Sequence, residues 1–363
     1  MRVAVRVDAS PLIGGGHAMR CLTLADELAR RGTGVTFVSA VMPDSLGKRI
    51  MAAGHELARI AMPAGLERAG EDWHEPPLDA AAQAADVRQT AAAADGADWC
   101  VVDHYLLDEH WNSAARGFAG RLLIIDDLAN RRYDADLLVD ETGDRTRADY
   151  DGLVGAETIV LAGAGYALLR PEFAQQRPAA LERRREPKAP RRILISLGTM
   201  DPGGISAVAL DAVLAAAPEC AIDVVLGADA PSAGRILQMA GQRGGISVHV
   251  DTDRMAELTR DADLAIGAAG TTSWERCCLG LPAIALVLAD NQRANAEALA
   301  RSGAAIAVDN ASEIGPALAN LLRDEQRLHE MSKAAFQLTD GLGTKRVADA
   351  MLDARAEVAA VRA

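Results

Sequence analysis

Short apolar runs alternate with longer helical stretches along almost the whole chain, and this alternation restricts the fold more than any other feature. It is typical of parallel βα units, in which a helix connects each strand to the next. In the N-terminal half we expect strands at 2–7, 34–39, 99–103, 121–126, 136–140 and 159–162. In the C-terminal half we expect strands at 192–197, 222–226, 246–250, 263–268, 282–288 and 304–308. The pattern predicts an α/β protein with two Rossmann-like βα domains.

The helices predicted in the N-terminal half cover residues 17–31, 44–53, 78–95 and 108–118. Proline and dense charge interrupt the alternation at 174–191, which we interpret as a linker. The predicted domains are therefore 1–173 and 192–363, and 363 residues suffice for two such cores. Because open parallel sheets bind ligands beyond the carboxyl ends of their strands, we expect the domains to face each other across a cleft that holds the ligand.

The net charge of −13 argues against binding to nucleic acid or to an anionic membrane, since both need basic surfaces. No apolar run approaches the length of a membrane span, and the chain opens without a charged leader, so we expect a soluble cytoplasmic protein. The five cysteines are odd in number and lack CxxC spacing, which favours reduced thiols. The sequence leaves the oligomeric state open, with a monomer favoured.

A glycine turn, Gly14-Gly15-Gly16, joins the first predicted strand to a helix that begins near His17. A dinucleotide fingerprint would need glycine or alanine where Met19 stands, and a Walker A loop would need Gly-Lys-Ser/Thr. The dipole at the start of a helix disfavours the imidazolium, and a general base requires the neutral imidazole. His17 is therefore either a general base or a structural residue that caps the helix.

A second small-residue turn follows the strand predicted at 263–268, and Thr271, Thr272 and Ser273 open the next helix. Amides and hydroxyls at such a position can bind phosphate. Glu275, about one turn later, could accept hydrogen bonds from a ribose diol. The alternative is ordinary capping of the helix, with Glu275 complementing its dipole.

Two further strand ends carry polar candidates. Asn291 and Gln292 follow the strand at 282–288, where their side chains could reach ligand oxygens, although asparagine is also a common helix cap. Gly198 and Thr199 follow the strand at 192–197, the first strand after the predicted linker. These positions extend the predicted ligand site over three strand ends of the C-terminal domain.

Several motifs, taken in order, resemble the family of UDP-2,4-diacetamido-2,4,6-trideoxy-β-L-altropyranose hydrolases of pseudaminic acid biosynthesis. The motifs are RVDASPLIGGGHAMRCLTLADEL, VVDHYLLDEHW, IIDDLANRRYDADLLVDE, YALLRPEF and GAAGTTSWERCCLGLPAIALVLADNQ. The resemblance covers residues 1–310, is weaker at 63–95, and does not extend beyond 320. It implies the two-domain nucleotide-sugar fold called GT-B, shared with the glycosyltransferase that makes lipid II.

The resemblance also implies an activity: water separates UDP from the sugar by attack at the anomeric carbon. His17 corresponds to the family's proposed base, and the loop from Gly270 to Thr272 would hold the diphosphate. Glu275 would bind the ribose, and Asn291 with Gln292 would face the diphosphate or the sugar. The residues placed near the sugar are Asp8, Asp103 and Tyr105, on the N-terminal side.

The chain departs from the family in two places. Gly15 stands where many relatives have serine or threonine, and Ser196–Asp201 reads Ser-Leu-Gly-Thr-Met-Asp where relatives have Ser-Phe-Gly-Gly-Ser-Asp. The second change adds a side chain beside the phosphate or sugar, so it bears on the identity of the sugar. Two other functions remain open: a glycosyltransferase that uses a similar UDP-sugar, and a nucleotide-sugar-binding protein without catalysis.

No cofactor is expected, because backbone amides can hold the leaving group. The seven histidines show no HExxH pair. Asp126 and Asp127 are interpreted as the end of a strand and the cap of a turn, in preference to magnesium ligands.

Overall fold

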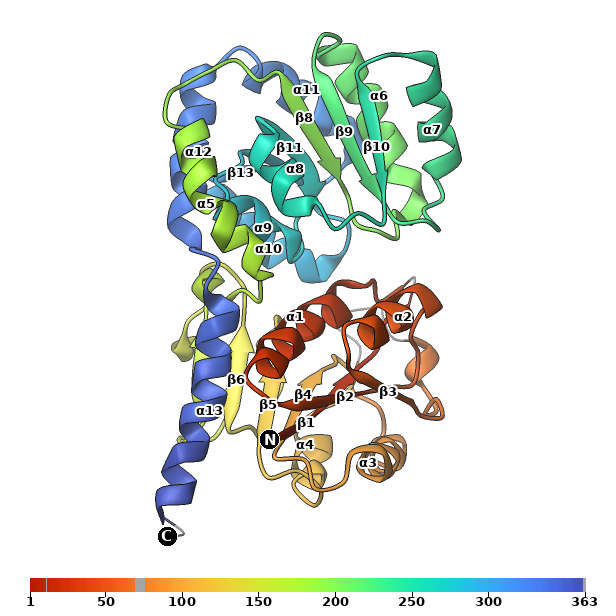
Figure 1. The fold of residues 1–363 in the computed structure, drawn as a ribbon, viewed down its shortest axis with the longest axis vertical. Coiled ribbons are helices and arrows are strands. Elements are labelled where there is room, and N and C mark those ends of the chain that lie inside the picture. Colours follow the sequence, from red (N-terminus) through yellow and green to blue (C-terminus); the bar gives the residue numbers. More distant parts are fainter. Residues whose placement is uncertain (11, 69–75, 362–363) are drawn as a thin grey trace. The chain divides into compact units, whose positions relative to one another are not determined.

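The computed structural model describes residues 1–10, 12–68 and 76–361, which form two compact units (Figure 1). The N-terminal unit contains residues 1–168 together with 343–363, and the C-terminal unit contains residues 169–342. Each unit is built on one parallel β-sheet, as the alternation of apolar runs and helices predicts.

The sheet of the N-terminal unit has seven strands in the order β3-β2-β1-β4-β5-β6-β7. The strands are β1 (Arg2–Val7), β2 (Gly34–Ser39), β3 (Glu56–Arg59), β4 (Trp99–Asp103), β5 (Leu122–Ile125), β6 (Leu137–Asp140) and β7 (Ile159–Ala162). The helices are α1 (Gly16–Arg30), α2 (Asp44–Ala52), α3 (Ala80–Ala94), α4 (Glu109–Ala115) and α13 (Gly343–Val361). Short 3-10 helices lie at Leu66–Arg68, Arg147–Tyr150 and Ala164–Tyr166.

The sheet of the C-terminal unit has six strands in the order β10-β9-β8-β11-β12-β13. The strands are β8 (Arg192–Ser196), β9 (Ala221–Leu226), β10 (Ile246–Val250), β11 (Leu264–Ala268), β12 (Ala283–Leu286) and β13 (Ala305–Val308). The helices are α5 (Pro171–Arg183), α6 (Ile205–Ala216), α7 (Ala233–Gln242), α8 (Met255–Asp261), α9 (Thr272–Cys278), α10 (Arg293–Ser302), α11 (Ile314–Leu321) and α12 (Glu325–Leu338). Short 3-10 helices lie at Pro202–Gly204, Asp290–Gln292 and Ala311–Glu313.

Every predicted strand is present, and β1, β2, β4, β7 and β10 have the predicted bounds. The strand β3 escaped prediction because its sequence, Glu-Leu-Ala-Arg, alternates weakly and lies at the edge of the sheet, where both faces need not be apolar. The four predicted N-terminal helices are confirmed, each shorter than or shifted from its predicted range by a few residues.

The division between the units differs from the predicted boundaries in two places. Residues 171–183 form α5, so much of the predicted linker 174–191 is a helix of the C-terminal unit. Arg184 donates hydrogen bonds to three carbonyls around the end of α8, and Lys188 pairs with Asp263 at 2.8 Å. The charged segment after α5 is therefore held against the C-terminal unit, because Arg184 bonds to backbone carbonyls and Lys188 to a carboxylate.

The C-terminal domain was predicted as 192–363, but its last helix, α13, belongs to the N-terminal unit. Apolar residues of α13, Val347, Ala348 and Met351, are buried in the same core cluster as α1. Arg31 pairs with Asp349 at 2.6 Å, and Arg346 donates to the carbonyl of Gly165. In Figure 1 this helix is drawn in blue and labelled α13. Sequence order alone gave no reason to expect the return of the chain.

Alternation along the strands builds two cores in the N-terminal unit, one on each face of its sheet. Val3, Val5 and Val7 of β1 pack on the face covered by α1 and α13, and Ala4 packs on the face covered by α3 and α4. The C-terminal unit has its own core of strand and helix residues. Within the described residues, no helix is long and apolar enough to cross a membrane. All five cysteines are free thiols.

Candidate functional site

The carboxyl edge of the N-terminal sheet carries an acidic residue at the end of each of four neighbouring strands. The residues are Asp8 after β1, Asp103 at the end of β4, Asp126 and Asp127 after β5, and Asp140 at the end of β6. Since the strands are parallel, these side chains meet at one edge, where ligands of such sheets bind. The cations and hydrogen-bond donors that pair with these carboxylates determine which side chains at this edge can take part in a reaction.

The glycine turn brings His17 to the same edge. Gly14 has a φ of +81°, a conformation that side chains other than glycine rarely adopt, and its amide donates to the carbonyl of Ser10 at 2.8 Å. The helix α1 then begins at Gly16, so His17 lies in its first turn and is buried. The turn thus confines the imidazole beside the end of β4.

His17 and Asp103 form a close pair, with Nδ1 of the imidazole 2.6 Å from Oδ1 of the carboxylate. Because an ionised carboxylate only accepts hydrogen bonds, Nδ1 carries the proton and Nε2 carries the lone pair of the neutral ring. The ring of Tyr105 meets the imidazole edge to face, with the ring centroids 4.9 Å apart. The structure therefore brings together three predicted site residues, His17, Asp103 and Tyr105.

Arg20, one turn after His17, holds this pair in place. Its Nε and Nη2 donate to both oxygens of Asp103 at 2.7 and 2.8 Å, and its Nη1 donates to Asp127 at 2.9 Å. Tyr105 donates its hydroxyl to the other oxygen of Asp127 at 2.7 Å. The network His17-Asp103-Arg20-Asp127-Tyr105, which we call the histidine cluster, is continuous and almost entirely buried.

The charge of Arg20 keeps the carboxylates of the histidine cluster ionised. Burial by itself would raise the pKa of Asp103, but the charge and the hydrogen bonds of Arg20 lower it well below its ordinary value. Burial would likewise raise the pKa of Asp127, but the charge and the hydrogen bond of Arg20 lower it below its ordinary value. Asp103 can therefore act as the permanent anion that orients His17 at neutral pH.

Asp8 lies at this edge but is fully engaged by the protein. Its carboxylate accepts from Ser39, from the amides of residues 40 and 41 and from His104 at 3.1 Å, and it forms an ion pair with Arg6 at 2.8 Å. The sequence placed Asp8 near the sugar, whereas these contacts favour a structural role in fixing the loop after β2. Direct contact between Asp8 and a sugar stays a prediction.

His104 shows what a structural histidine looks like at this edge. Its Nδ1 accepts from the amide of Leu106 at 3.1 Å, and its Nε2 donates to Asp8 at 3.1 Å. Both ring nitrogens therefore have protein partners, which fixes the neutral tautomer and leaves no lone pair for base catalysis. His104 precedes Tyr105 and helps to anchor the segment that carries it.

A second layer of acids lies beside the histidine cluster. Tyr150 contacts Asp126 at 2.9 Å and Asp140 at 2.7 Å, and Asp126 also accepts from the amide of Ala129. The pKa of Asp140 is raised to about 7 by burial and by the negative charges of Asp127 and Asp126. Asp126 thus ends a strand and caps a turn, as the sequence indicates.

Glu141, which follows β6, is a buried acid with one engaged oxygen. Its Oε1 accepts from the amide of Leu168 at 3.0 Å, and none of the residues that the structure describes hydrogen-bonds to its Oε2. Burial raises its pKa to about 7, against the opposing charge of Arg20. Glu141 is therefore a group near the histidine cluster that titrates close to neutral pH.

The C-terminal unit presents its candidates at the carboxyl ends of β8, β11 and β12, which are adjacent in the sheet. Gly198 follows β8 with a φ of +96°, and the carbonyl of Thr199 accepts from the amide of Gly227. A Cβ on Gly227 would lie 2.4 Å from that carbonyl oxygen, so the position of the loop containing Thr199 requires glycine at residue 227. Thr199 itself is exposed at this edge.

Gly270 and Gln292 lie close together, although the helix α9 and the strand β12 separate them in the sequence. A Cβ placed on Gly270 would be 3.5 Å from Nε2 of Gln292, and Oε1 of Gln292 accepts from the amide of Leu288 at 3.1 Å. Gln292 therefore closes its own loop over the turn after β11. Asn291 belongs to the same short 3-10 helix as Gln292.

The turn after β11 leads into α9, and Thr271 is the residue before its first position. Glu275, within the first turn of α9, pairs with Arg170 at 3.7 Å. Burial raises the pKa of Glu275, and the charge of Arg170 opposes that rise. The predicted phosphate and ribose residues of this unit therefore share one strand edge, where hydroxyls, amides and glycines predominate.

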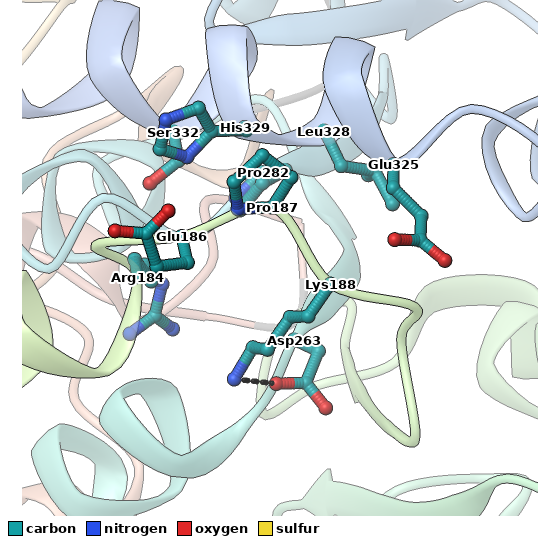
Figure 2. Close-up of a pocket in the computed structure, with 10 residues that line it drawn as sticks. All are labelled: Arg184, Glu186, Pro187, Lys188, Asp263, Pro282, Glu325, Leu328, His329 and Ser332. Carbon is teal, nitrogen blue, oxygen red and sulfur yellow. Dashed lines mark ion pairs between the residues drawn. The ribbon is translucent and has the colours of Figure 1, made fainter.

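A separate pocket lies at the opposite edge of the C-terminal sheet (Figure 2). It is lined by Arg184, Glu186, Pro187, Lys188, Asp263, Pro282, Glu325, Leu328, His329 and Ser332. Asp263 and Pro282 precede β11 and β12, so the pocket faces the amino ends of these strands. Figure 2 shows Lys188 reaching Asp263, and none of the predicted site residues lines the pocket.

Comparison with known proteins gives the family context. Residues 240–350 match the glycosyltransferase family 28 C-terminal domain, a segment that includes the predicted site from Gly270 to Gln292. At the level of solved structures, MurG of Acinetobacter baumannii covers 97% of this chain and 99% of its own, with a TM-score of 0.63 and 17% identity. The chain has the GT-B fold. A UDP-GlcNAc 2-epimerase of Neisseria meningitidis bound to UDP-GlcNAc also has a TM-score of 0.63, at 12% identity over 97% of this chain and 100% of its own.

Relatives at the sequence level are distant. An uncharacterized protein of Methanocaldococcus jannaschii is 24% identical over 81% of this chain and 57% of its own length, and the spore coat polysaccharide biosynthesis protein SpsG of Bacillus subtilis is 29% identical over 55% and 60%. The chain thus spans less than two thirds of each of these relatives. The UDP-2,4-diacetamido-2,4,6-trideoxy-β-L-altropyranose hydrolase of Campylobacter jejuni is 22% identical over 84% of this chain and 97% of its own.

Within this GT-B chain, sequence reasoning missed Arg20, His104 and Asp127 as parts of the N-terminal edge. The spacing offered a signal for Arg20, because residues three apart on a helix share a face, and His17 had already been singled out. The sequence indicated for Asp127, together with Asp126, only the end of a strand and the cap of a turn. No group of three or more histidine, cysteine, aspartate or glutamate side chains among the described residues could hold a metal ion.

Proposed function

We propose that the protein is a hydrolase that separates UDP from a UDP-sugar by attack of water at the anomeric carbon. The observation that carries the proposal is the pair of His17 and Asp103, at 2.6 Å, with Asp103 fixed by Arg20. A histidine whose Nδ1 is held by a buried carboxylate is suited to accept a proton at Nε2. A protein that only binds nucleotide sugars would have no need of this arrangement.

Water forms a bond from its oxygen to the anomeric carbon while Nε2 of His17 takes one water proton. The bond between the anomeric carbon and the phosphate oxygen breaks, and UDP leaves with the electron pair. Asp103 stabilises the imidazolium that forms, and Arg20 holds Asp103 in position. The products are the free sugar and UDP.

The carboxyl edge of β8, β11 and β12 is proposed to bind UDP. Gly270, Thr271 and Thr272 supply amides and hydroxyls for the diphosphate, and Glu275 is suited to the ribose. Gln292 and Asn291 close the neighbouring loop. The match of residues 240–350 to the glycosyltransferase family 28 C-terminal domain supports this assignment.

The proposed sugar is 2,4-diacetamido-2,4,6-trideoxy-β-L-altropyranose. It is the sugar named in the Campylobacter jejuni relative, and the motifs shared with that family extend over both units. Thr199 and Met200 replace Gly-Ser of the family pattern in the loop after β8, where Thr199 is exposed and Met200 is half-buried. They are the residues we expect to modify the choice of sugar.

A glycosyltransferase that uses a similar UDP-sugar is the second candidate, because MurG shares the fold over nearly the whole chain. Both candidates need a base at His17, so they differ in the acceptor: water for the hydrolase, a hydroxyl group of another molecule for the transferase. Release of UDP without an added acceptor separates them.

The proposal is tested with purified protein and UDP-2,4-diacetamido-2,4,6-trideoxy-β-L-altropyranose in water enriched in heavy oxygen. We expect UDP to be released, with the heavy oxygen on the sugar, as measured by NMR and mass spectrometry. Heavy oxygen on the phosphate would contradict attack at carbon and the role of His17. Binding of UDP without release would favour the transferase or a binding protein.

A further inference from the structure

Arg276 is a buried cation without a carboxylate partner. Its side chain lies in α9 behind the turn after β11, and only 4% of the residue is exposed. Among the described residues, no aspartate or glutamate forms an ion pair with it, in contrast to Arg6 and Arg20 of the N-terminal unit. A buried charge that lacks a counter-charge is costly.

The guanidinium is held by neutral acceptors. Nη2 donates to the carbonyl of Ala268 at 2.6 Å and to Oγ of Ser273 at 2.9 Å, and Nη1 donates to Oγ1 of Thr272 at 3.2 Å. These acceptors are all neutral, and Glu275, whose charge favours the charged form of Arg276, forms no ion pair with it among the described residues. Burial accordingly lowers the pKa of Arg276 below its ordinary value.

The strand β11 has a glycine where the guanidinium lies. A Cβ on Gly267 would be 2.3 Å from Nη1 of Arg276 and 3.1 Å from the carbonyl oxygen of Ser196. Any side chain at this position would displace the guanidinium. The absence of a side chain at Gly267 therefore makes room for a cation at the carboxyl edge of the sheet.

The contact with Thr272 fixes the direction of a hydroxyl. Because Oγ1 of Thr272 accepts from Arg276, its own proton is left to donate elsewhere. The hydroxyl of Ser273, by comparison, is directed to the carbonyl of Ala268 at 3.3 Å. Thr272 is half-buried and lies in the loop assigned to the diphosphate, so it is presented as a donor to a ligand.

We propose that Arg276 is a positioning residue for the diphosphate of the nucleotide: it supplies the positive charge behind the turn after β11 and orients the hydroxyl of Thr272 toward a phosphate oxygen. The ligand class is an anion of high charge density, such as a nucleoside diphosphate. This inference rests on the proposed function, because it takes the same loop as the nucleotide site. Arg276 is buried beneath the loop, so it acts through its electrostatic field and through the hydroxyl of Thr272.

The test compares the binding of UDP, of inorganic pyrophosphate and of uridine to wild type, Arg276→Met and Arg276→Lys by titration calorimetry. Two unit charges several ångström apart interact strongly enough, at an effective dielectric constant near 20, to change affinity by about tenfold to a hundredfold. We expect Arg276→Met to weaken UDP and pyrophosphate by that factor and to leave uridine within about twofold. Arg276→Lys should weaken UDP by less, because it keeps the charge and loses part of the hydrogen-bond fork.

A matched control is Arg235→Met, which removes an arginine from the same unit at an exposed pair with Asp211 and should not change UDP affinity. Denaturant unfolding supplies the second readout. A structural role alone would lower the stability of Arg276→Met while the folded protein bound UDP normally, and that result would overturn the inference. If Arg276→Met does not fold, the affinities for UDP, pyrophosphate and uridine are compared instead between wild type, Arg276→Lys and Gly267→Ala. The added methyl group of Gly267→Ala would displace the guanidinium.

The outcomes separate this inference from the proposed function. Failure of wild-type protein to bind UDP would refute the nucleotide site itself. Normal UDP binding by wild type and by folded Arg276→Met would refute only the role of Arg276. Equal losses of UDP and uridine affinity would show a general disturbance of the site and would also overturn the role proposed for its charge.

Discussion

The two parallel sheets end in edges of opposite character. The edge of the N-terminal sheet carries Asp8, Asp103, Asp127 and Asp140, with Arg6, Arg20 and Arg145 as their counter-charges. The edge of the C-terminal sheet carries glycines, threonines and amides, with Arg276 buried behind it and unpaired with any carboxylate of the described residues. The same architecture thus presents a paired acidic edge in one unit and, in the other, an edge rich in backbone amides and hydroxyls with a buried arginine behind it.

The difference indicates two kinds of ligand chemistry. Paired acids and arginines fix the orientation of His17 and add little net charge, which suits an uncharged sugar and a water molecule. Amides, hydroxyls and a cation suit the diphosphate, whose charge must be held locally in a protein with a net charge of −13. The contrast therefore divides the proposed reaction into a proton-transfer part and an anion-binding part.

The largest effect should come from breaking the N-terminal edge with Asp103→Asn. The amide cannot hold His17 in the productive tautomer, so we expect turnover to fall by about two to four orders of magnitude. Arg20 loses one of its two carboxylates, so the free energy of unfolding should fall by about 3 kcal/mol. Steady-state kinetics and denaturant unfolding measure the two effects.

The control for this variant is Asp134→Asn, which removes one acid of an exposed pair with Arg116 and should cost less than about 1 kcal/mol. Unchanged turnover in folded Asp103→Asn would contradict the role of the His17 and Asp103 pair.

The next effect concerns pH and Glu141. The folded pKa of about 7 lies above the ordinary value of 4.5, so the folded state holds this proton longer than the unfolded state does. Between about pH 4.5 and about pH 7, ionisation in the unfolded chain destabilises the folded wild type relative to Glu141→Gln. At 1.36 kcal/mol per pKa unit, the difference in unfolding free energy should grow by about 3 kcal/mol over that window.

Denaturant unfolding of both proteins at pH 4.5 and pH 8 measures this change. A constant difference between wild type and Glu141→Gln at the two pH values would show that Glu141 has no raised pKa. Glu109→Gln serves as the control, because its side chain is exposed and pairs with Arg132 at the surface.

The smallest effect should come from Ser39→Ala, which removes the hydroxyl 2.9 Å from Asp8. Asp8 keeps Arg6, His104 and two amides, so we expect a loss of about 1 kcal/mol in the free energy of unfolding. Thr36→Ala, which removes an exposed hydroxyl bonded to Glu56, is the matched control and should cost less. An equal cost for the two variants would show that the acidic edge depends little on this bond.

The fold was largely predictable because every strand of it except β3 is a short apolar run flanked by helical stretches. The return of α13 was not, since nothing in a helix's own residues specifies which of two sheets it will cover. His17, Asp103 and Tyr105 were predicted as separate site residues, and the structure joins them through Arg20 and Asp127. Such links depend on contacts between strands far apart in sequence, which spacing does not encode.

The two edges also differ in how much of their chemistry the sequence revealed. Glycines and threonines after β11 indicated a phosphate site by local pattern alone. The buried position of Arg276 could not be found that way, because it depends on the carbonyl and hydroxyl groups that surround the guanidinium in space and on Gly267 in the neighbouring strand. Asp8, which the resemblance places near the sugar, also belongs to a network that only the packed sheet creates, and its contact with a sugar stays a prediction.

The measurement that tests the central claim most directly is a comparison of turnover and UDP affinity in His17→Ala, with the exposed His110→Ala as the control. The division between the two edges predicts that His17→Ala lowers kcat by about two to four orders of magnitude while the Kd for UDP changes by less than about twofold. His110→Ala should change neither quantity. A large loss of UDP affinity in folded His17→Ala, or unchanged turnover, would contradict the account.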